Sequence, residues 1–304
     1  MNGILIIDKP RDFTSFDVVA VMRRLCSQKK IGHTGTLDPM ATGVLPLLLG
    51  NAARAQAILP DSDKEYTADF QLGVTTDTLD STGRVLSRAE SFCVTREELC
   101  RALMPFRGDI MQTPPMYSAV SKDGKRLYEL ARKGIEVERE KRPVTVSRLE
   151  LLSYDEKTAC GQLEIACSKG TYVRSLIDDI GKSLGCGGMM TGLRRTRACG
   201  FTLDDALTLN QMKELSETGR IAEQLRPVES LFMQYREIEV SGAQGVRFQN
   251  GGALDLCRTA LRSGCGENEI FRVKAADGQF MGLGMADLEK QALVIYKLFP
   301  RGQA

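Results

Sequence analysis

The sequence has no tryptophan and a single histidine, His33, among its 304 residues. Its nine cysteines are an odd number and include no C-x-x-C pair, which argues against both a disulfide scaffold and a zinc ribbon. Because most metal sites combine several histidine or cysteine ligands, no structural or catalytic metal is expected. A reducing cytoplasm is the simplest compartment for this cysteine content.

Long apolar runs and charged tails are also missing. The apolar stretch 3–7 is ended by Asp8 and Lys9, well before a signal peptide or a membrane span would be complete. Lysine and arginine number 41 against 39 aspartates and glutamates, so the total charge identifies no partner. We therefore expect no membrane segment. The chain has the length of about two domains, and its 42% of apolar residues are enough to form a sizeable hydrophobic core.

Basic residues are concentrated in three segments instead. Residues 8–30 contain six lysines and arginines, residues 121–142 contain eight, and residues 193–197 contain three arginines. Such patches attract polyanions even when the total charge is near zero. The segment 121–142 also has a short helical pattern around Leu127 and Leu130, and we expect it to form a basic excursion from the core.

Hydrophobic periodicity predicts a mixed α/β chain. Residues 3–7 are expected to form a buried strand, and Ser15 is expected to cap the helix that follows. Strict alternation over residues 65–72 predicts a half-buried strand with Tyr66 facing inward. Between them, residues 32–43 are too rich in glycine and threonine for regular structure and predict a loop.

The second half of the chain continues this mixture. A capping-box pattern at Thr95 predicts a helix over 95–106. Strands are expected near 144–154 and 163–168, and Thr171 is expected to start a helix with one continuous apolar stripe.

Short alternating segments past Leu231 predict a small β-rich domain. An Asp277-Gly278 pair is typical of a hairpin turn, and a last strand is expected over 292–298. We expect a chain truncated after about Tyr235 to retain its chemistry.

The glycine-rich segment 32–43 contains no common phosphate-binding motif. A P-loop needs its second glycine followed by lysine and serine or threonine, and a dinucleotide site needs G-x-G-x-x-G; neither occurs. What remains is Asp38, a carboxylate before a proline. Taken singly, each of these residues has a structural role as its default. Asp38 before a proline is typical of a turn, His33 of a hydrogen-bonded structural or surface residue, and Tyr66 of a core residue. Arg174 is expected to pair with Asp178 one turn along its helix.

Several motifs, in order along the chain, resemble those of the TruB family of tRNA pseudouridine synthases. They are GILIIDKP at 3–10, TS at 14–15, GHTGTLDPMATGVLP at 32–46, KEY at 64–66, GVTTDT at 73–78 with Asp80, PPMYSAV at 114–120, GTYVRSL at 170–176 and LRRT at 193–196. The similarity extends over about residues 1–230. An ordered series of this length is far more specific than any single motif.

This resemblance implies the fold and its division. It implies an α/β (α+β) catalytic domain around a mixed, largely antiparallel sheet, followed by a small β-rich domain similar to the PUA RNA-binding module. The expected bounds are residues 1–232 and 236–304. The basic excursion, at about 118–143, resembles the thumb-like insertion of the stand-alone bacterial enzymes.

The resemblance also implies an activity, the isomerisation of uridine 55 in the T-loop of tRNA to pseudouridine on a flipped-out base. Asp38 matches the nucleophilic aspartate, Tyr66 the tyrosine that stacks on the base and is implicated in removing the proton from ring carbon 5, and Arg174 the arginine that pairs with the aspartate. The implied substrate-binding residues are His33, Tyr172, Leu193, Lys9 and Lys64.

No cofactor or metal is expected, because the isomerisation involves no net redox change and no leaving phosphate. The expected partner is the T-stem-loop of tRNA, and the expected state is a cytoplasmic monomer. Two alternatives stay open at this point. A non-catalytic tRNA-binding folding factor would need only the basic patches, and a small-molecule kinase or transferase would use the glycine-rich loop.

Overall fold

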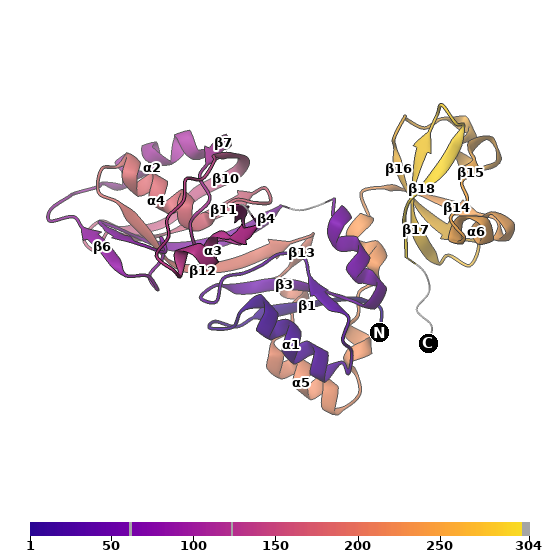
Figure 1. Cartoon of the computed structure of the whole chain (residues 1–304), viewed down its shortest axis with the longest axis horizontal. Helices are drawn as coiled ribbons and strands as arrows, with labels where there is room; N and C mark the ends of the chain where they lie inside the picture. The colour runs from indigo at the N-terminus through magenta and orange to yellow at the C-terminus, as the bar shows by residue number, and fades with distance from the viewer. Residues whose placement is uncertain (61–62, 123, 300–304) are drawn as a thin grey trace.

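A computed structural model describes residues 1–60, 63–122 and 124–299. Its largest element is a nine-stranded sheet (Figure 1). The main path of the sheet is β1 (Gly3–Lys9), β3 (Thr42–Leu49), β12 (Gly188–Ala198), β4 (Lys64–Leu72), β11 (Cys160–Cys167), β10 (Arg142–Asp155) and β7 (Gly108–Gln112), with β2 (Ile31–His33) beside β3 and β13 (Phe201–Thr202) beside β12. Only β3 and β12 pair in parallel, so the mixed, largely antiparallel sheet predicted from the sequence is confirmed.

The two faces of β1 and β3 bury two different hydrophobic clusters. Leu5 and Ile7 on one face pack with the helices α1 and α5, whereas Ile4 and Ile6 on the other face pack with the 3-10 helix η1. The bounds of these helices are α1 (Ser15–Leu25), α5 (Leu209–Glu217) and η1 (Gly50–Ile58). The period of two along a strand thus places successive residues of β1 in separate cores.

The start of α1 differs from the prediction by one residue. Thr14 is the N-cap, because its side chain accepts a hydrogen bond from the backbone of Asp17 and the Asp17 carboxylate accepts one in return. Ser15 is the first residue of the helix rather than its cap, and its side chain is buried against the loop that precedes β3.

A third cluster lies where α4 and α2 cover β4, β10, β11 and β12. The two helices are α4 (Val173–Ser183) and α2 (Arg96–Leu103). The predicted capping box at Thr95 is confirmed. Helix α4 starts at Val173, two residues later than predicted. The Tyr172 amide donates to Gln112 Oε1 at 2.8 Å, and Gln112 Nε2 donates to the Tyr172 carbonyl at 3.1 Å, which holds Tyr172 outside the helix.

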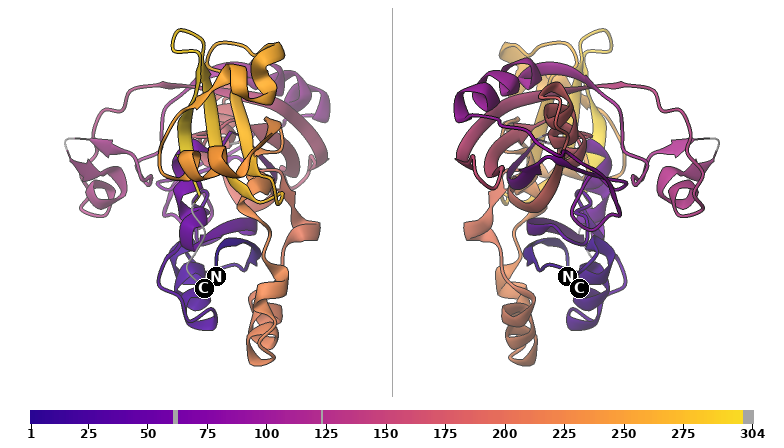
Figure 2. Two further views of the ribbon diagram at one scale, coloured as in Figure 1. Left: turned by 90° about the vertical axis from the view of Figure 1, so that its right-hand side faces the viewer. Right: turned by 90° about the vertical axis from the view of Figure 1, so that its left-hand side faces the viewer.

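Two hairpins extend from this core. One is β5 (Val74–Thr76) with β6 (Val85–Arg88), and the other is β8 (Ser121–Lys122) with β9 (Lys125–Arg126), followed by α3 (Leu127–Ala131). The second hairpin and α3 project from the side of the molecule, as Figure 2 shows. The predicted basic excursion is therefore present, although its residue 123 lies outside the described residues.

The C-terminal part forms a separate five-stranded sheet. Its strands, in order, are β14 (Arg236–Val240), β16 (Ile270–Ala275), β17 (Phe280–Asp287), β18 (Ala292–Leu298) and β15 (Leu254–Asp255), with helix α6 (Gly242–Gln249). Two 3-10 helices belong to this part, η6 (Leu256–Arg258) and η7 (Ala260–Ser263). Besides η1, those that precede it are η2 (Met104–Phe106), η3 (Leu203–Asp205), η4 (Ile221–Gln224) and η5 (Val228–Phe232). The predicted Asp277-Gly278 hairpin joins β16 to β17, while residues 300–304 lie outside the described part.

A shared core joins the two sheets. Phe232, completely buried, stacks on Phe280 at 6.2 Å between ring centroids and lies 5.7 Å from Phe299. The cluster that contains these rings also contains Ile4 and Ile6 of β1. Truncation after Tyr235 would remove part of this core, including Phe299, so the predicted activity of a truncated chain depends on how well the rest of the cluster stays folded.

Ion pairs connect η5 to the C-terminal sheet and continue within that sheet. Glu229 of η5 accepts from Arg272 and from Lys274, 3.1 Å away, both on β16. Glu237 of β14 pairs with the same two residues, at 3.2 and 3.0 Å.

Phe232→Ala is expected to lower the free energy of unfolding by about 3–5 kcal/mol, the usual cost of emptying a ring-sized space in a core. Chemical denaturation monitored by circular dichroism measures this loss. Phe16→Ala is the matched control, because the Phe16 side chain is 63% exposed and its loss should cost less than about 0.5 kcal/mol. Equal stabilities of the two variants would contradict a core shared by the two sheets.

Candidate active site

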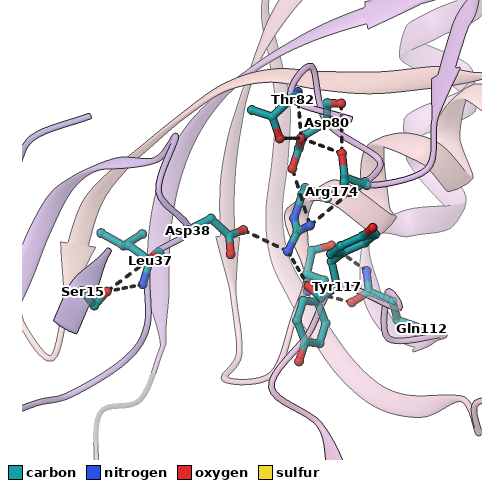
Figure 3. Close-up of polar contacts among 10 residues, drawn as sticks. Ser15, Leu37, Asp38, Asp80, Thr82, Gln112, Tyr117 and Arg174 are labelled. Carbon is teal, nitrogen blue, oxygen red and sulfur yellow. Dashed lines mark hydrogen bonds and ion pairs between the residues drawn. The ribbon is translucent and has the colours of Figure 1, made fainter. Parts of the chain in front are cut away.

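Asp38 lies in a loop that neighbouring segments hold firmly. This Asp38 loop, residues 34–41, runs from β2 to β3, and Leu37 within it is buried. The Ser15 hydroxyl accepts from the Leu37 amide at 2.8 Å and donates to the Leu37 carbonyl at 3.2 Å (Figure 3). The backbone of Asp12 donates to Pro39 on the other side of Asp38. The residues on both sides of Asp38 are thus fixed to the segment around the start of α1.

Lys9 supports the same loop from beneath. Its side chain is completely buried, and Nζ donates to the carbonyl oxygens of Pro10 at 2.9 Å, Phe13 at 2.5 Å and Pro39 at 3.2 Å. An ammonium group has three N–H donors, so these bonds occupy all of them. The resemblance implied a substrate contact for Lys9, but these contacts make it a support of the Asp38 loop.

The buried ammonium of Lys9 predicts a pH-dependent stability. Burial lowers the pKa of Lys9 from 10.5 to about 8, although Asp38 opposes the shift. Between these pH values the unfolded chain holds more protons, so a rising pH stabilises the folded protein. From pH 8 to pH 10.5, we expect the unfolding free energy of the wild type to rise by about 1–3 kcal/mol relative to Lys9→Met. Urea unfolding at both pH values tests this; a constant difference would contradict it.

Arg174 connects Asp38 to a second carboxylate. Its Nη2 lies 3.0 Å from Asp38 Oδ2, and its Nη1 lies 3.5 Å from Asp80 Oδ2. The guanidinium also donates to the carbonyl oxygens of Tyr117 at 3.0 Å and Thr78 at 3.1 Å. Arg174 is buried, so these four acceptors fix its plane and its direction toward Asp38 (Figure 3). The helix pair with Asp178 is not formed; Asp178 binds Lys182 instead.

The surroundings of Asp38 act on its pKa in opposite directions. Burial raises the pKa of Asp38 and the charge of Asp80 adds to the rise, while Arg174 and, more weakly, Lys9 lower it. Arg174 is therefore the strongest influence that favours the ionised carboxylate. A carboxylate that acts as a nucleophile has to be ionised, and a guanidinium stays charged under all ordinary conditions.

Asp80 is a site residue that sequence reasoning placed in a motif without giving it a role. Its side chain is buried, and Oδ1 accepts from the Thr78 hydroxyl at 2.8 Å and from the Thr82 amide and hydroxyl at 3.0 and 2.5 Å. Aspartate followed by Ser-Thr-Gly is also the composition of an ordinary turn. The pairing with Arg174 depends on residues 94 positions apart, and nothing local in the sequence indicates it.

Tyr66 extends from β4 into the same region. It is buried in the cluster that also contains Leu37 of the Asp38 loop, with Leu193 packed against that cluster. Burial raises the pKa of the Tyr66 phenol to about 12, while the charge of Arg195 on the neighbouring strand opposes this effect.

The burial of Arg195 contradicts the prediction that was made from its charge. As one of three arginines within residues 193–197 it was expected to face a polyanion, yet its side chain is completely buried. Its neighbours are also engaged: Arg194 pairs with Asp8 at 2.9 Å and Arg197 with Glu65 at 3.4 Å. A run of arginines on a strand puts alternate residues on opposite faces, which composition alone does not reveal.

His33 and Lys64 lie on the side of the Asp38 loop that faces Arg195. Burial lowers the pKa of both side chains, and the charge of Arg195 lowers each further. A Cβ added to Gly35 would come within 3.3 Å of Lys64 Cε and 3.7 Å of Arg195 Nη1, so the glycine leaves room for both. These two predicted substrate-binding residues therefore border the loop, whereas Tyr172 lies beyond it at the start of α4.

Two family models together cover residues 23–233, which include Asp38, Tyr66 and Arg174. Residues 23–173 match the TruB family pseudouridylate synthase N-terminal domain, and residues 174–233 match the tRNA pseudouridylate synthase B C-terminal domain. The tRNA pseudouridine synthase B of Aromatoleum aromaticum is 45% identical over 287 residues, which cover 94% of this chain and 89% of that protein. The chain belongs to the TruB family of pseudouridine synthases. A TruB protein of Clostridium tetani is 39% identical over 304 residues and covers 98% of this chain and 99% of its own length.

Solved structures agree with the TruB fold. A Cbf5-Nop10-Gar1 complex contains a chain with a TM-score of 0.73 and 24% identity, covering 98% of this chain and 85% of that one. An H/ACA RNP bound to a substrate RNA containing 2'-deoxyuridine gives the same TM-score at 23% identity. At this identity the similarity shows the fold, including the C-terminal sheet domain predicted from the sequence.

Within the described residues of this TruB chain, no group of three or more His, Cys, Asp or Glu side chains is arranged to hold a metal ion. None of the helices in that part is both long and apolar enough to cross a membrane.

Proposed function

We propose that this TruB-family isomerase converts uridine 55 in the T-loop of tRNA to pseudouridine, with Asp38 as the nucleophile. The observation that carries the proposal is the ion pair of Asp38 with the buried Arg174, 3.0 Å long, on a loop that is fixed on both sides. A preorganised carboxylate of this kind can attack the target uridine and form a covalent intermediate.

Arg174 has two tasks in this mechanism. It offsets the effect of burial on Asp38, and its fixed plane directs one carboxylate oxygen toward the substrate. Asp80 and the carbonyl oxygens of Thr78 and Tyr117 hold the guanidinium in that orientation. The glycosidic bond then breaks, the uracil turns, and a carbon–carbon bond to ring carbon 5 forms.

Tyr66 and Leu193 form the apolar side of the pocket. A tyrosine face can stack on any pyrimidine, and we propose that the phenol of Tyr66 also removes the proton from ring carbon 5. The target base is stacked inside a folded loop of the tRNA, so it has to be flipped out at a cost of a few kcal/mol. Contacts of His33 and Lys64 with the RNA beside the target would help to offset that cost.

The basic excursion would hold the stem of the T-arm. The hairpin of β8 and β9 and the helix α3 project from the catalytic core (Figure 2). Within the basic excursion, Lys125 and Lys133 are exposed. We propose that residues 236–304 form the PUA-like domain, which contacts the tRNA away from the target loop. The protein would act as a cytoplasmic monomer, and its chemistry involves no cofactor.

Lys125→Ala and Lys133→Ala are each expected to weaken tRNA binding and to lower its dependence on salt. Each lost phosphate contact reduces the slope of log affinity against log salt concentration by roughly 0.7–0.9. Filter binding of tRNA over a salt series measures the slope. Lys213→Ala, on an exposed face of α5, is the matched control, and an equal change in that variant would contradict a specific role for the excursion.

Release of tritium from tRNA labelled at carbon 5 of uridine tests the function directly. An unmodified transcript is incubated with the protein, without nucleotide and with a chelator. We expect stoichiometric release, since the proton at carbon 5 is replaced by the bond to ribose. A folding factor would release none, and a kinase or transferase would need its co-substrate, so an inert reaction would reject the proposed function. A transcript with cytidine at position 55 controls for the site.

A further inference from the structure

Arg195 carries a hydrogen-bond donor that the fold does not use. It lies on β12, beside Tyr66 on β4 and Gly43 on β3. Nε donates to the Val44 carbonyl at 2.7 Å and Nη2 to the Gly35 carbonyl at 3.1 Å, and both acceptors are neutral. The buried Nη1 has no partner within the residues that the structure describes. A buried donor of a charged group is costly to leave unpaired, so its retention needs a reason.

The charges around Tyr66 indicate what this donor serves. Burial raises the pKa of the Tyr66 phenol, and Cys167 on β11 and Asp38 in its loop raise it further. Arg195 on β12 is the group that lowers it. Among the described neighbours of Tyr66, Arg195 therefore favours the phenolate, the form that can accept a proton.

We propose that Arg195 is a positioning residue that stabilises the phenolate of Tyr66 through Nη1 while Tyr66 takes the proton from ring carbon 5. The proposal rests on the role given to Tyr66 under the proposed function. A donor already in place where negative charge develops needs no rearrangement during the reaction. Nε and Nη2 fix the guanidinium to β3 and to the Asp38 loop, which leaves Nη1 for this task.

The step is balanced in protons and electrons. After carbon 5 has bonded to the ribose, its C–H bond breaks and the proton goes to the Tyr66 phenolate oxygen. The electron pair of that bond forms the double bond between carbons 5 and 6, and the pair of the N1–carbon 6 double bond passes to N1, which takes a proton from water. Tyr66 returns its proton to water before the next turnover.

A purely structural role for Arg195 has to be separated from this one. Nε and Nη2 alone would connect β3 to the Asp38 loop, and any loss of that connection would slow every step of the reaction. Single-turnover rates on saturating tRNA are therefore compared for Arg195→Met, Tyr66→Phe and the double variant. Methionine is apolar and similar in length, although it leaves the Val44 and Gly35 carbonyl oxygens without their Arg195 donors. Thermal unfolding and tRNA binding verify that each variant is folded.

We expect Arg195→Met to lower the rate about 10²-fold in the wild type and to have no further effect beside Tyr66→Phe. Equal losses in both backgrounds would show that Arg195 acts as a structural connection and would overturn the proposal. A normal rate for Arg195→Met beside an impaired Tyr66→Phe would refute the role of Arg195 alone. A normal rate for Tyr66→Phe would refute the proton acceptor itself, and with it this part of the proposed function.

A more acidic phenol provides a second measurement. 3,5-Difluorotyrosine at position 66 reaches the phenolate form at lower pH, so it should restore the rate of Arg195→Met by at least about 10-fold and shift the pH–rate profile downward. Arg195→Lys, which keeps the charge, should lose less than Arg195→Met. 3,5-Difluorotyrosine at position 296 is the control for this probe, because the Tyr296 side chain is 39% exposed. No rescue at position 66 would reject the proposal, because a structural defect is insensitive to phenol acidity.

Discussion

Asp38→Asn is expected to abolish turnover while leaving tRNA binding nearly unchanged. The amide has almost the shape of the carboxylate, but it lacks the charge and the nucleophilic oxygen that a covalent intermediate requires. Arg174 retains Asp80 and two carbonyl oxygens as partners, so the fold of the site should persist. We expect the single-turnover rate to fall by at least about 10⁴-fold, as is typical when a catalytic nucleophile is removed.

Single-turnover tritium release on purified protein, together with filter binding of tRNA, measures both expectations. Asp204→Asn is the matched control, because Asp204 is exposed on η3 and outside the site. Product formation within a factor of ten of the wild type would mean that Asp38 is only a turn residue.

Arg174→Lys is expected to lower the rate by about 10²-fold or more, despite the retained charge. The guanidinium satisfies two carboxylates and two carbonyl oxygens from one rigid plane, whereas an ammonium is a single point that cannot reach all four. One carboxylate is therefore left with weaker support, and the direction of Asp38 is no longer fixed. Because the group is buried, the melting temperature should fall as well.

Single-turnover rates and thermal unfolding of the same preparation test this prediction. Arg220→Lys is the control, since the Arg220 side chain is 60% exposed and pairs with Glu223 at the surface. A near-normal rate for Arg174→Lys, with unchanged thermal stability, would show that the pair with Asp38 contributes nothing to catalysis.

Local patterns predicted the elements of this fold well. The alternation around Tyr66, the capping box at Thr95 and the Asp277-Gly278 turn each depend on residues within one element, and the structure confirms all three. The cap of α1 was misplaced by one residue because Thr14 and Ser15 are adjacent and both are good capping side chains, with serine the more common of the two. The reciprocal bonds of Thr14 with Asp17 and the tertiary contact of Ser15 with Leu37 separate them.

The site was predicted in part. Motif resemblance identified Asp38, Tyr66 and Arg174, and the ion pair between the first and the last is present. The resemblance implied a substrate contact for Lys9, and the basic run 193–197 implied a polyanion contact for Arg195, although both side chains are completely buried. A long cationic side chain is normally exposed, so burial of such a group cannot be inferred from composition. Whether such a side chain is buried depends on which strands become neighbours in the sheet.

The core shared by the two sheets has a consequence for synthesis of the chain. Ile4 and Ile6 leave the ribosome well before Phe299 of the same cluster, which lies almost the whole described chain away in sequence. At about 5–20 residues per second, roughly 15–60 s separate these events. During that interval β1 can pair with β3, but the other face of β1 lacks the aromatic residues that complete its cover. The nascent protein therefore exposes an apolar surface until Phe299 has been made, and a chaperone that binds such surfaces would meet it at this stage.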